Sequence, residues 1–569
     1  MTNNSETLID KTQPQLISSE SKNNLHHWQT KLLSSWERVA FWLILAIAAI
    51  LRLYKFPNLP AGLWVDEATN GYDAYSLLQN GTDRWGNRFP IYFPNWGSGQ
   101  NVLEAYLSIP FIKLFGLNLL SIRIVPVTLG ILAIPLLYFT VKKVYGVHTG
   151  LLAAFLMATL PWHLMVSRWS MESNLLPFFF LLNIATLLYC YDTPERQRWI
   201  PLSLIPLALS FYAYGTALVP ATLFLLSFWL FNYKTIWHKK WSFLASLVIF
   251  LIIATPFFLF ILENYVLHKQ IRHLSSLPFS IPLFPSNRLD QVNEQYTRLG
   301  ILKSNLRFLI SGYQDGWTFN SVPWISALGW LVPPFSTLGL YFSLKQRPLS
   351  KNLFVFWLIA VSPLFILFIF TVHRSNSIYV PLIVLGAYGI VCLLKYVQPL
   401  NNQIVVTIVL VGTIFLPNML FYQYYFTDNG PQLSTFNADN AAAFNAGFDS
   451  TLQHALSQAH KDEHIYINTN HDWATYADTL FYLHPDPKDF YTHADTQIID
   501  GKYWVLSYNR FFFGPFAPVD KINQAPSYVA VLKTGFDVSC QRKDVLYVDN
   551  TWPNDTWTVV RCFPDHSNP

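Results

Sequence analysis

Long apolar stretches recur along this chain of 569 residues, and they constrain the fold more than any other feature of the sequence. A helix that crosses a lipid bilayer needs roughly 20 mostly apolar residues. About eleven such stretches precede the last third of the chain, centred near Leu45, Leu132, Phe155, Leu182, Leu207, Leu225, Ile249, Gly339, Leu358, Gly386 and Ile408. Hydrophobic residues make up 52% of the chain and charged residues only 12%. We therefore expect a polytopic α-helical membrane protein with about eleven transmembrane helices, and not a soluble enzyme.

Basic residues indicate how these helices are oriented. Lysines and arginines cluster in alternate short connections between the apolar stretches, at 142–143, 196–198, 234–240, 345–351 and 395. Clusters of this kind mark the cytoplasmic side of a membrane protein. The sequence thus predicts a multi-pass protein of the cell membrane with its N-terminus in the cytoplasm and its C-terminus outside. The net charge of +5 is small and scattered, which argues against a nucleic-acid partner.

Changes in polarity along the chain predict its domains. Residues 1–37 are polar and are expected to form a disordered cytosolic tail. Residues 38–424 hold the apolar stretches and form the membrane domain, with long outer loops at 57–120 and 263–322. The polar remainder, 425–569, is expected to be a soluble extracytoplasmic α/β module.

The first outer loop contains two segments that favour helices lying along the membrane surface. Residues 102–116 are apolar but include Glu104, Pro110 and Lys113, and a transmembrane assignment here would move every later basic connection to the outside. We therefore interpret this segment as an amphipathic surface helix, and residues 67–79 as a second one.

The C-terminal module has its own local signals. Residues 441–459 predict a helix, and the apolar runs at 464–467 and 503–506 predict strands. Cys540 and Cys562 both fall in this module, and the sequence leaves open whether they form a disulfide.

Two adjacent carboxylates, Asp66 and Glu67, are the strongest functional signal. They follow the first apolar stretch by about ten residues. Ionisable groups near lipid are costly unless they face water or a partner, so they are functional candidates by default. The alternative is that both simply favour the N-terminus of the following surface helix.

A second polar cluster lies between the third and fourth apolar stretches and contains Arg168 and Glu172. On a helix, residues four apart share a face, so the two side chains could simply pair with each other. The alternative is that Glu172 faces Asp66 across a cavity, where it would bind a metal or position a sugar. Arg168 is then a candidate substrate-binding residue that helps to stabilise the phosphate of the donor.

Further candidate substrate-binding residues follow later stretches at their outer ends. His373 and Arg374 suit a phosphate at the depth of the lipid headgroups, although an arginine there also snorkels in ordinary membrane proteins. Tyr212 and Tyr214 suit a sugar or a prenyl chain, although tyrosines also form interfacial belts. Arg123 could assist, but we expect a structural role for it.

Three strings carry a resemblance to a known family: Gly62 to Glu67, Leu119 to Pro126, and Arg168 to Glu172. With the predicted surface helices and outer module, they make the chain similar to the GT-C glycosyltransferases, most of all to the family 39 and 83 group. That group includes protein O-mannosyltransferases and the aminoarabinose transferase of lipid A. The similarity covers roughly residues 38–425. Many relatives carry a Lys- or His-Pro-Pro-Leu string where this chain has Gly99-Gln100-Asn101-Val102, so the acceptor class is left open.

The resemblance implies a function and roles for the acidic residues. Asp66 would be the catalytic acid or base with Glu67 beside it, and Glu172 would match the second acidic site. Relatives use a sugar linked to a polyprenyl phosphate in the membrane, and we expect transfer to a hydroxyl acceptor with inversion. A divalent metal held by Asp66 and Glu172 is left open, and no other cofactor is expected.

Two other classes of function are alternatives to the transferase. One is a transporter or flippase of lipid-linked sugars, whose charged residues usually lie near the middle of the bilayer. The other is a binding scaffold in which the outer module acts. The sequence contains no Gly-rich phosphate loop, Walker motif or zinc-type array of His and Cys, so ATP-driven transport and a soluble nucleotide-sugar site have no support.

Overall fold

A computed structural model of the chain describes residues 35–95, 97–191, 193–271, 277–286, 296–317, 320, 322, 324–346, 352–397, 400–427, 444–468, 475–551 and 556–564. Residues 44–569 form one compact unit, to which the following description applies. The predicted tail lies outside the described residues as far as residue 34, and the first helix begins at Ser35.

Every predicted apolar stretch has its centre on a helix. These helices are α2 (Ser35–Leu53), α5 (Leu119–Tyr145), α6 (Val147–Thr159), α8 (Leu176–Cys190), α9 (Ile205–Ala213), α10 (Leu218–His238), α11 (Lys240–Ile261), α14 (Val332–Gln346), α15 (Leu353–Val361), α17 (Asn376–Tyr396) and α18 (Leu400–Phe426). The predicted polytopic helical fold is thereby confirmed.

The number of transmembrane helices stays a prediction. Among the described residues, six helical stretches are long and apolar enough to cross a membrane, and two more are apolar but shorter. Proline explains some of the short helices, because it lacks the N–H that an α-helix needs. Pro363 separates α15 from the single turn α16 (Leu364–Leu367), and Pro201 lies in a 3₁₀ segment before α9.

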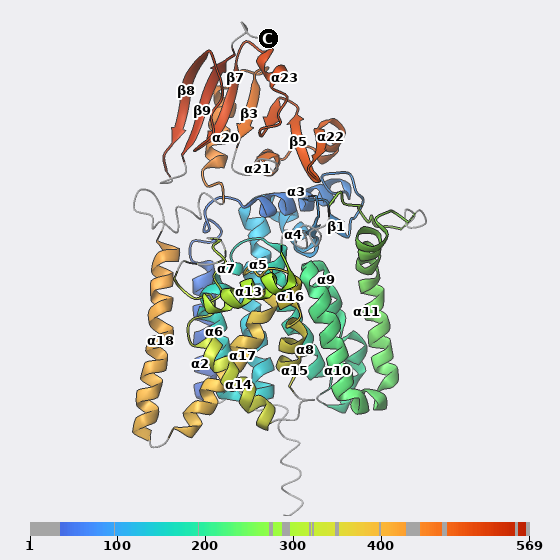
Figure 1. Ribbon diagram of the computed structural model, residues 1–569, viewed down its shortest axis with the longest axis vertical. Helices are drawn as coiled ribbons and strands as arrows, with labels where there is room; N and C mark the ends of the chain where they lie inside the picture. Colours follow the sequence, from blue (N-terminus) through green and yellow to red (C-terminus); the bar gives the residue numbers. More distant parts are fainter. Residues whose placement is uncertain are drawn as a thin grey trace, which may run out of the picture. The chain divides into compact units, whose positions relative to one another are not determined.

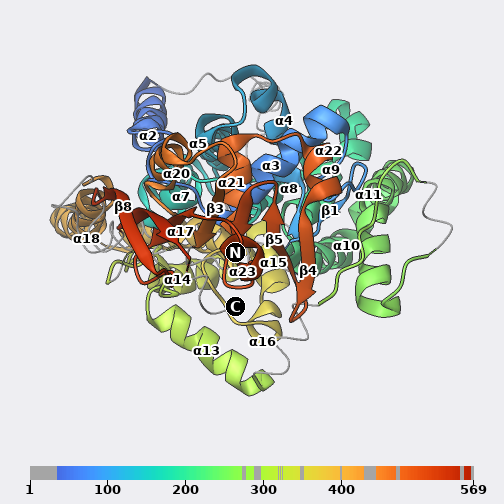
Figure 2. The same cartoon turned by 90° about the horizontal axis from the view of Figure 1, so that it is seen from above.

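Helices α5, α6, α8 and α17 pack together at the centre of the helical part (Figure 1). Glycines let α14 and α17 approach closely: a Cβ at Gly339 would lie 1.8 Å from the carbonyl oxygen of Leu385, and one at Gly389 would lie 2.2 Å from that of Phe335. Small residues at a helix contact serve the same purpose in many membrane proteins. Helices α11 and α18 lie on opposite flanks (Figure 2).

Short elements connect α2 to α5. They are α3 (Val65–Asn80), the antiparallel pair β1 (Tyr92–Phe93) and β2 (Gln100–Asn101), and α4 (Leu103–Phe115). The two helices predicted at 67–79 and 102–116 are thus present, and α3 packs against α4. Other short elements are α7 (Pro161–Val166), the 3₁₀ helix Glu172–Leu175, a π-helical turn at Leu262–Leu267 and α13 (Arg298–Ile310).

The C-terminal module is built on a seven-stranded sheet in the order β4-β5-β6-β3-β7-β9-β8. Its strands are β3 (His464–Asn468), β4 (Asp495–Ile499), β5 (Lys502–Tyr508), β6 (Phe511–Phe513), β7 (Tyr528–Lys533), β8 (Arg542–Asp549) and β9 (Trp557–Phe563). Strand β3 pairs in parallel with β6 and β7, and the other pairs are antiparallel. Both predicted strands are present, as β3 and β5. Cys540 and Cys562 form a disulfide.

The helices of this module are α20 (Phe448–Gln458), α21 (Thr475–Leu483), α22 (Pro487–His493) and α23 (Val519–Asn523). The predicted helix at 441–459 is thus present from Phe448, and its first three residues lie outside the described residues. Helix α21 packs against α3, and buried side chains of both, such as Tyr72 and Phe481, belong to one hydrophobic cluster. The module is therefore fixed directly to the segment that carries Asp66.

Candidate active site

Asp66 and Glu67 lie in the first turn of α3, where carboxylates interact favourably with the helix dipole. The backbone N–H of Trp64 donates to Glu67 Oε2 at 3.1 Å, so Glu67 does cap the helix. The indole Nε1–H of Trp64 donates to Asp66 Oδ2, also at 3.1 Å. The exposure of the two neighbours differs: Asp66 is partly exposed, whereas Glu67 is completely buried.

Glu67 forms a buried ion pair with Arg123 of α5. The Nε and Nη2 atoms of Arg123 lie 2.8 Å from Oε1 and 2.6 Å from Oε2 of Glu67, in a bidentate arrangement. The backbone N–H of Ser170 adds a hydrogen bond of 2.7 Å to Oε1. With the contact from Trp64, four N–H groups bind this carboxylate. Such a group is suited to holding α3 in place, which differs from the catalytic role expected of Glu67.

Arg123 also fixes the loop before the acidic pair. Its Nη1 atom donates to the carbonyl oxygens of Pro57 and Pro60 at 2.7 Å, and Nη2 donates to that of Gly62 at 2.8 Å. A guanidinium has five N–H donors, and these contacts with those to Glu67 engage each of its nitrogens. The structural role expected of Arg123 agrees with this geometry.

Gln100 joins Asp66 to Glu172. Its side-chain Nε2 donates to the backbone carbonyl of Asp66 and to Glu172 Oε2, both at 3.2 Å. Its Oε1 accepts from the Thr69 hydroxyl and from Asn95 Nδ2, both at 3.0 Å. Gln100 is 1% exposed and Glu172 3% exposed. The structure therefore brings the two acidic positions that the sequence singled out to one buried amide.

Asn101, the next residue of β2, fixes the turn that holds the candidate tyrosines. Its Oδ1 accepts from the backbone N–H of Gly215 at 3.0 Å, and its Nδ2 donates to the carbonyl of Phe211 at 2.9 Å. Tyr214 lies buried between these two anchors. The hydroxyl of Tyr212 instead donates to the carbonyl of Ile253 on α11 at 2.6 Å, so it serves the packing of α9 against α11.

Arg168 neither pairs with Glu172 nor presents its guanidinium to a substrate, the two roles that the sequence suggested. Its guanidinium is fully buried and donates to four backbone carbonyls at the C-terminal end of α2 and just beyond it, namely those of Leu51, Arg52, Tyr54 and Leu59, at 2.7 to 3.3 Å. The last carbonyls of a helix have no partners within the helix. Arg168 satisfies them, and its guanidinium is directed at α2 and not at Glu172.

The segment that carries His373 and Arg374 leads into α17, whose first residue contacts Ser173. Asn376, at the start of α17, donates through Nδ2 to the carbonyl of Ser173 at 3.1 Å. His373 and Arg374 are both partly exposed, and His373 Nδ1 lies 3.0 Å from Nδ2 of Asn320. Asn376 therefore joins the start of α17 to the 3₁₀ helix that begins with Glu172, whereas the side chain of His373 contacts Asn320.

Glu104 is a further acid of this region. It lies in the first turn of α4, is 1% exposed, and accepts a hydrogen bond of 3.0 Å from the Ser108 hydroxyl. The pKa of its carboxyl is raised to about 7: burial is the main cause, the hydroxyls of Ser170 and Ser108 oppose the shift, and the nearby charge of Glu67 adds to it. This carboxyl can therefore be neutral near pH 7.

Sequence reasoning named Gln100 and Glu104 but gave neither a role. Gln100 lies in the string that departs from the family pattern. Glu104 is one of the residues that make a transmembrane helix at 102–116 unfavourable. The available signal was an acid in the first turn of an otherwise apolar helix, because burying a carboxyl is costly without a function or a partner.

The described residues contain no cluster of three or more His, Cys, Asp and Glu side chains that could hold a metal. Gln100 binds the carboxylate of Glu172 and the backbone carbonyl of Asp66, so two acidic residues meet at this amide. Two carboxylates suit a hydrated Mg²⁺-type cation, which keeps several waters, and they do not suit a closed zinc site of four protein ligands.

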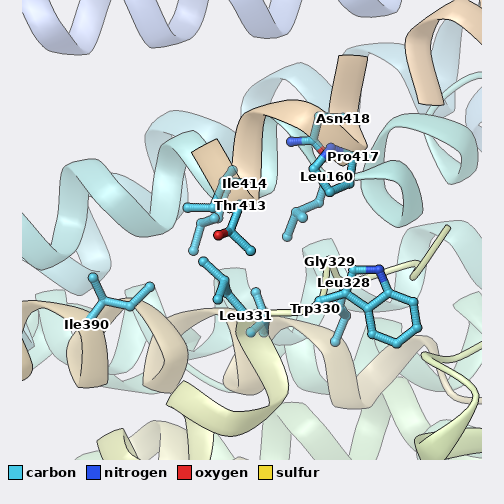
Figure 3. A pocket seen from close by; sticks show the side chains of 12 residues that line it. Leu160, Leu328, Gly329, Trp330, Leu331, Ile390, Thr413, Ile414, Pro417 and Asn418 are labelled. Carbon is cyan, nitrogen blue, oxygen red and sulfur yellow. The ribbon is translucent and has the colours of Figure 1, made fainter. Parts of the chain in front are cut away.

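A small apolar pocket lies away from this site, between α6, α14, α17 and α18. Figure 3 shows Thr413 and Ile414 of α18 across from Leu331 and Ile390. Its volume of about 10 Å³ holds at most one water molecule. This pocket is therefore too small for a lipid-linked substrate.

Comparisons with known proteins concern the family and the fold of the chain. Residues 102–260 match the family model described as dolichyl-phosphate-mannose-protein mannosyltransferase. No curated protein sequence shows a match to the chain.

Solved structures are similar in fold. ArnT from Cupriavidus metallidurans in the apo state matches with a TM-score of 0.54 and 11% identity, covering 92% of this chain and 97% of that one. The same protein bound to undecaprenyl phosphate matches with a TM-score of 0.52, 11% identity and the same coverage. The oligosaccharyltransferase of Archaeoglobus fulgidus, tethered with an acceptor peptide, matches with a TM-score of 0.51 and 12% identity over 79% of this chain and 63% of that one. The chain therefore shares the fold of these proteins, and its residues 102–260 resemble the dolichyl-phosphate-mannose-protein mannosyltransferase family.

Proposed function

We propose that the protein transfers a sugar from a polyprenyl-phosphate donor to a hydroxyl acceptor, with Asp66 as the general base. The main support for this role is the contrast between two neighbouring carboxylates. Glu67 is buried and bound by four N–H groups, whereas Asp66 is partly exposed at the start of the same helix. ArnT, which shares the fold, has been solved with undecaprenyl phosphate bound, and this supports a lipid-linked donor.

The proposed reaction is a single displacement. Asp66 takes the proton of the acceptor hydroxyl, and the oxygen forms a bond to the anomeric carbon of the sugar. The bond between that carbon and the donor phosphate breaks, and its electron pair leaves with the phosphate. Attack from the side opposite the leaving group inverts the anomeric centre. Proton abstraction by a positioned base contributes roughly 10² to 10⁴ in rate.

Arg374 is proposed to stabilise the departing phosphate, with His373 beside it. Both are partly exposed, and their segment is joined to Ser173, the neighbour of Glu172, through Asn376. A cation placed where negative charge develops stabilises the transition state more than the ground state. Arg168, whose guanidinium is used by the end of α2, takes no part in this proposal.

Glu67 and Arg123 act as positioning residues in this proposal, because they hold the loop before α3 and the first turn of α3, in which Asp66 lies. Glu172 positions a substrate hydroxyl or shares a divalent cation with Asp66, and such a cation would polarise a phosphate oxygen. No step of the proposed reaction passes through a metal.

The site is proposed to face outward. The disulfide between Cys540 and Cys562 lies in the module that packs on α3, and disulfides persist in oxidising compartments. A topology reporter fused after residue 569 tests this orientation, and a cytoplasmic signal would contradict it.

The substitution Asp66→Asn tests the function most directly. It removes the base and keeps the side-chain size, so turnover with a radiolabelled polyprenyl-phosphate sugar should fall roughly 10² to 10⁴-fold while the protein still folds and binds the donor. A panel of labelled donors identifies the sugar, and the fraction that takes up label identifies the acceptor.

A matched control is Asp544→Asn, at an ion-paired position on strand β8 of the C-terminal module. This variant should keep its turnover. If Asp66→Asn transfers sugar at the rate of the unmodified protein, the proposed role of Asp66 is wrong, and a transporter or scaffold becomes the better explanation.

A further inference from the structure

Helices α5 and α8 connect the active site to the opposite side of the membrane domain. Each begins near the site, where α5 carries Arg123 and α8 follows the 3₁₀ helix that starts at Glu172. On α5, Lys143 follows Arg123 by twenty residues, which is about 30 Å along a helix and equals the thickness of the hydrocarbon layer. The C-terminal ends of these helices therefore lie at the far side of the bilayer from the site.

A groove of about 340 Å³ lies between α5 and α8 toward these far ends. Its walls are mainly apolar and are formed by side chains such as Leu136, Phe139 and Leu188, of which Phe139 is 52% exposed. A volume of this size lies at the lower end of the range for small-molecule sites. The groove is thus large enough to take part of a lipid molecule.

Two cations line the groove at the end away from the active site. Lys143 Nζ donates to the carbonyl of Leu188 at 3.1 Å, which places the ammonium beside the end of α8. The guanidinium of Arg196 lies 4.5 Å from the centre of the Tyr189 ring, and this cation–π contact places it beside the same helix end. Glu195, which precedes Arg196, is exposed and is not among the residues that line the groove. An apolar groove that ends in two positive charges complements a molecule with an apolar tail and a negative head.

We infer that this groove binds an anionic phospholipid of the leaflet opposite the active site, with an acyl chain between α5 and α8 and the phosphate near Lys143 and Arg196. Anionic lipids attract basic side chains at the membrane surface, and the planar guanidinium of arginine suits phosphate oxygens. The inference is independent of the reaction proposed above, because none of the groove residues belongs to the active site.

Native mass spectrometry of the full-length protein tests the inference. The protein is released from micelles that contain equal amounts of phosphatidylglycerol and phosphatidylcholine, and the ratio of the two bound lipids is measured. The unmodified protein should retain phosphatidylglycerol preferentially. The double variant K143Q/R196Q should lower the affinity for phosphatidylglycerol by about thirty-fold, since each basic residue near a membrane surface contributes roughly a factor of five.

Two further variants separate the groove from general surface charge. Lys345 and Lys395 lie in the last turns of α14 and α17, and both are exposed. K345Q/K395Q removes the same charge and should leave the lipid ratio unchanged. Ala185 lines the groove, so Ala185→Phe should displace the lipid while both cations remain.

The ratio of bound lipids tests the inference, and no measurement of sugar transfer is needed. Loss of phosphatidylglycerol in K143Q/R196Q and in Ala185→Phe, but not in K345Q/K395Q, supports it. An unchanged lipid ratio in K143Q/R196Q overturns it, and so does an equal loss in K345Q/K395Q. Should K143Q/R196Q fail to fold, Ala185→Phe decides alone: retained preference for phosphatidylglycerol overturns the inference.

Discussion

The two ends of the helix pair α5 and α8 use charge in opposite ways. At the site end, Arg123 is completely buried and the structure gives each of its nitrogens a hydrogen-bond partner. At the other end, Lys143 is exposed and Arg196 partly exposed, beside an open apolar groove. The same two helices thus join a rigid polar network to a surface that water and lipid can reach.

This difference predicts how each end responds to substitution. In a buried network the loss of one partner leaves the other group desolvated and unpaired, which costs far more than the pair contributes. At an exposed end, water replaces the lost contact, so the cost for folding is small. The buried end therefore fixes geometry, whereas the exposed end selects ligands by charge.

The largest effect on stability is expected for Arg123→Met. This substitution leaves Glu67 buried without its cation and leaves the carbonyls of Pro57, Pro60 and Gly62 without their donor. Breaking a buried ion pair in this way costs about 3 to 5 kcal/mol. Thermal unfolding of the purified protein in detergent measures the loss.

The double variant Arg123→Met with Glu67→Gln provides the control. It removes both charges, so a substantial part of the stability should return, because no ion remains buried alone. If the double variant is less stable than Arg123→Met by the full cost of a second independent substitution, the ion pair is not the cause of the loss.

A smaller, pH-dependent effect is expected for Glu104→Gln. In the folded protein burial raises the pKa of Glu104 to about 7 from its usual 4.5, so the folded state binds the proton more tightly than the unfolded state. The resulting stabilisation is present below about pH 4.5 and is lost as the pH rises through 7. A shift of this size corresponds to at most about 3 kcal/mol.

Unfolding of the unmodified protein and of Glu104→Gln, compared from pH 5 to pH 8.5, measures this effect. The unmodified protein should lose stability relative to the variant as the pH rises. Glu195→Gln, at an exposed position, should show no such trend. A constant difference across the pH range for Glu104→Gln would show that its carboxyl does not titrate between pH 5 and 8.

The sequence predicted the helical part of the fold well because hydrophobicity is a local property. All eleven predicted centres fall on helices, and the helices predicted at 67–79 and 102–116 and two strands of the C-terminal module were also found. The acidic pair was singled out because ionisable groups near an apolar stretch are costly without a function or a partner, and its catalytic role stays a prediction.

The sequence failed where partners are far apart along the chain. Glu67 and Arg123 are separated by 56 residues, and Gln100 and Glu172 by 72. No local pattern shows that Glu67 is completely buried while Asp66 is not, or that Arg168 serves the end of α2. These distinctions depend on tertiary contacts, which single-sequence patterns do not contain.

The smallest effect on folding is expected for K143Q/R196Q, the pair whose loss should change lipid selectivity most. Both side chains retain access to water in the folded protein, so their substitution should change the free energy of unfolding by no more than about 0.5 kcal/mol per residue. Thermal unfolding in a detergent free of anionic lipid measures this intrinsic cost, and repeating it with phosphatidylglycerol adds the stabilisation from binding. The unmodified protein should gain stability from the lipid and K143Q/R196Q should gain little. A large loss in the lipid-free detergent would mean that these cations hold α5 against α8, as Arg123 holds α3, and the contrast between the two ends would disappear.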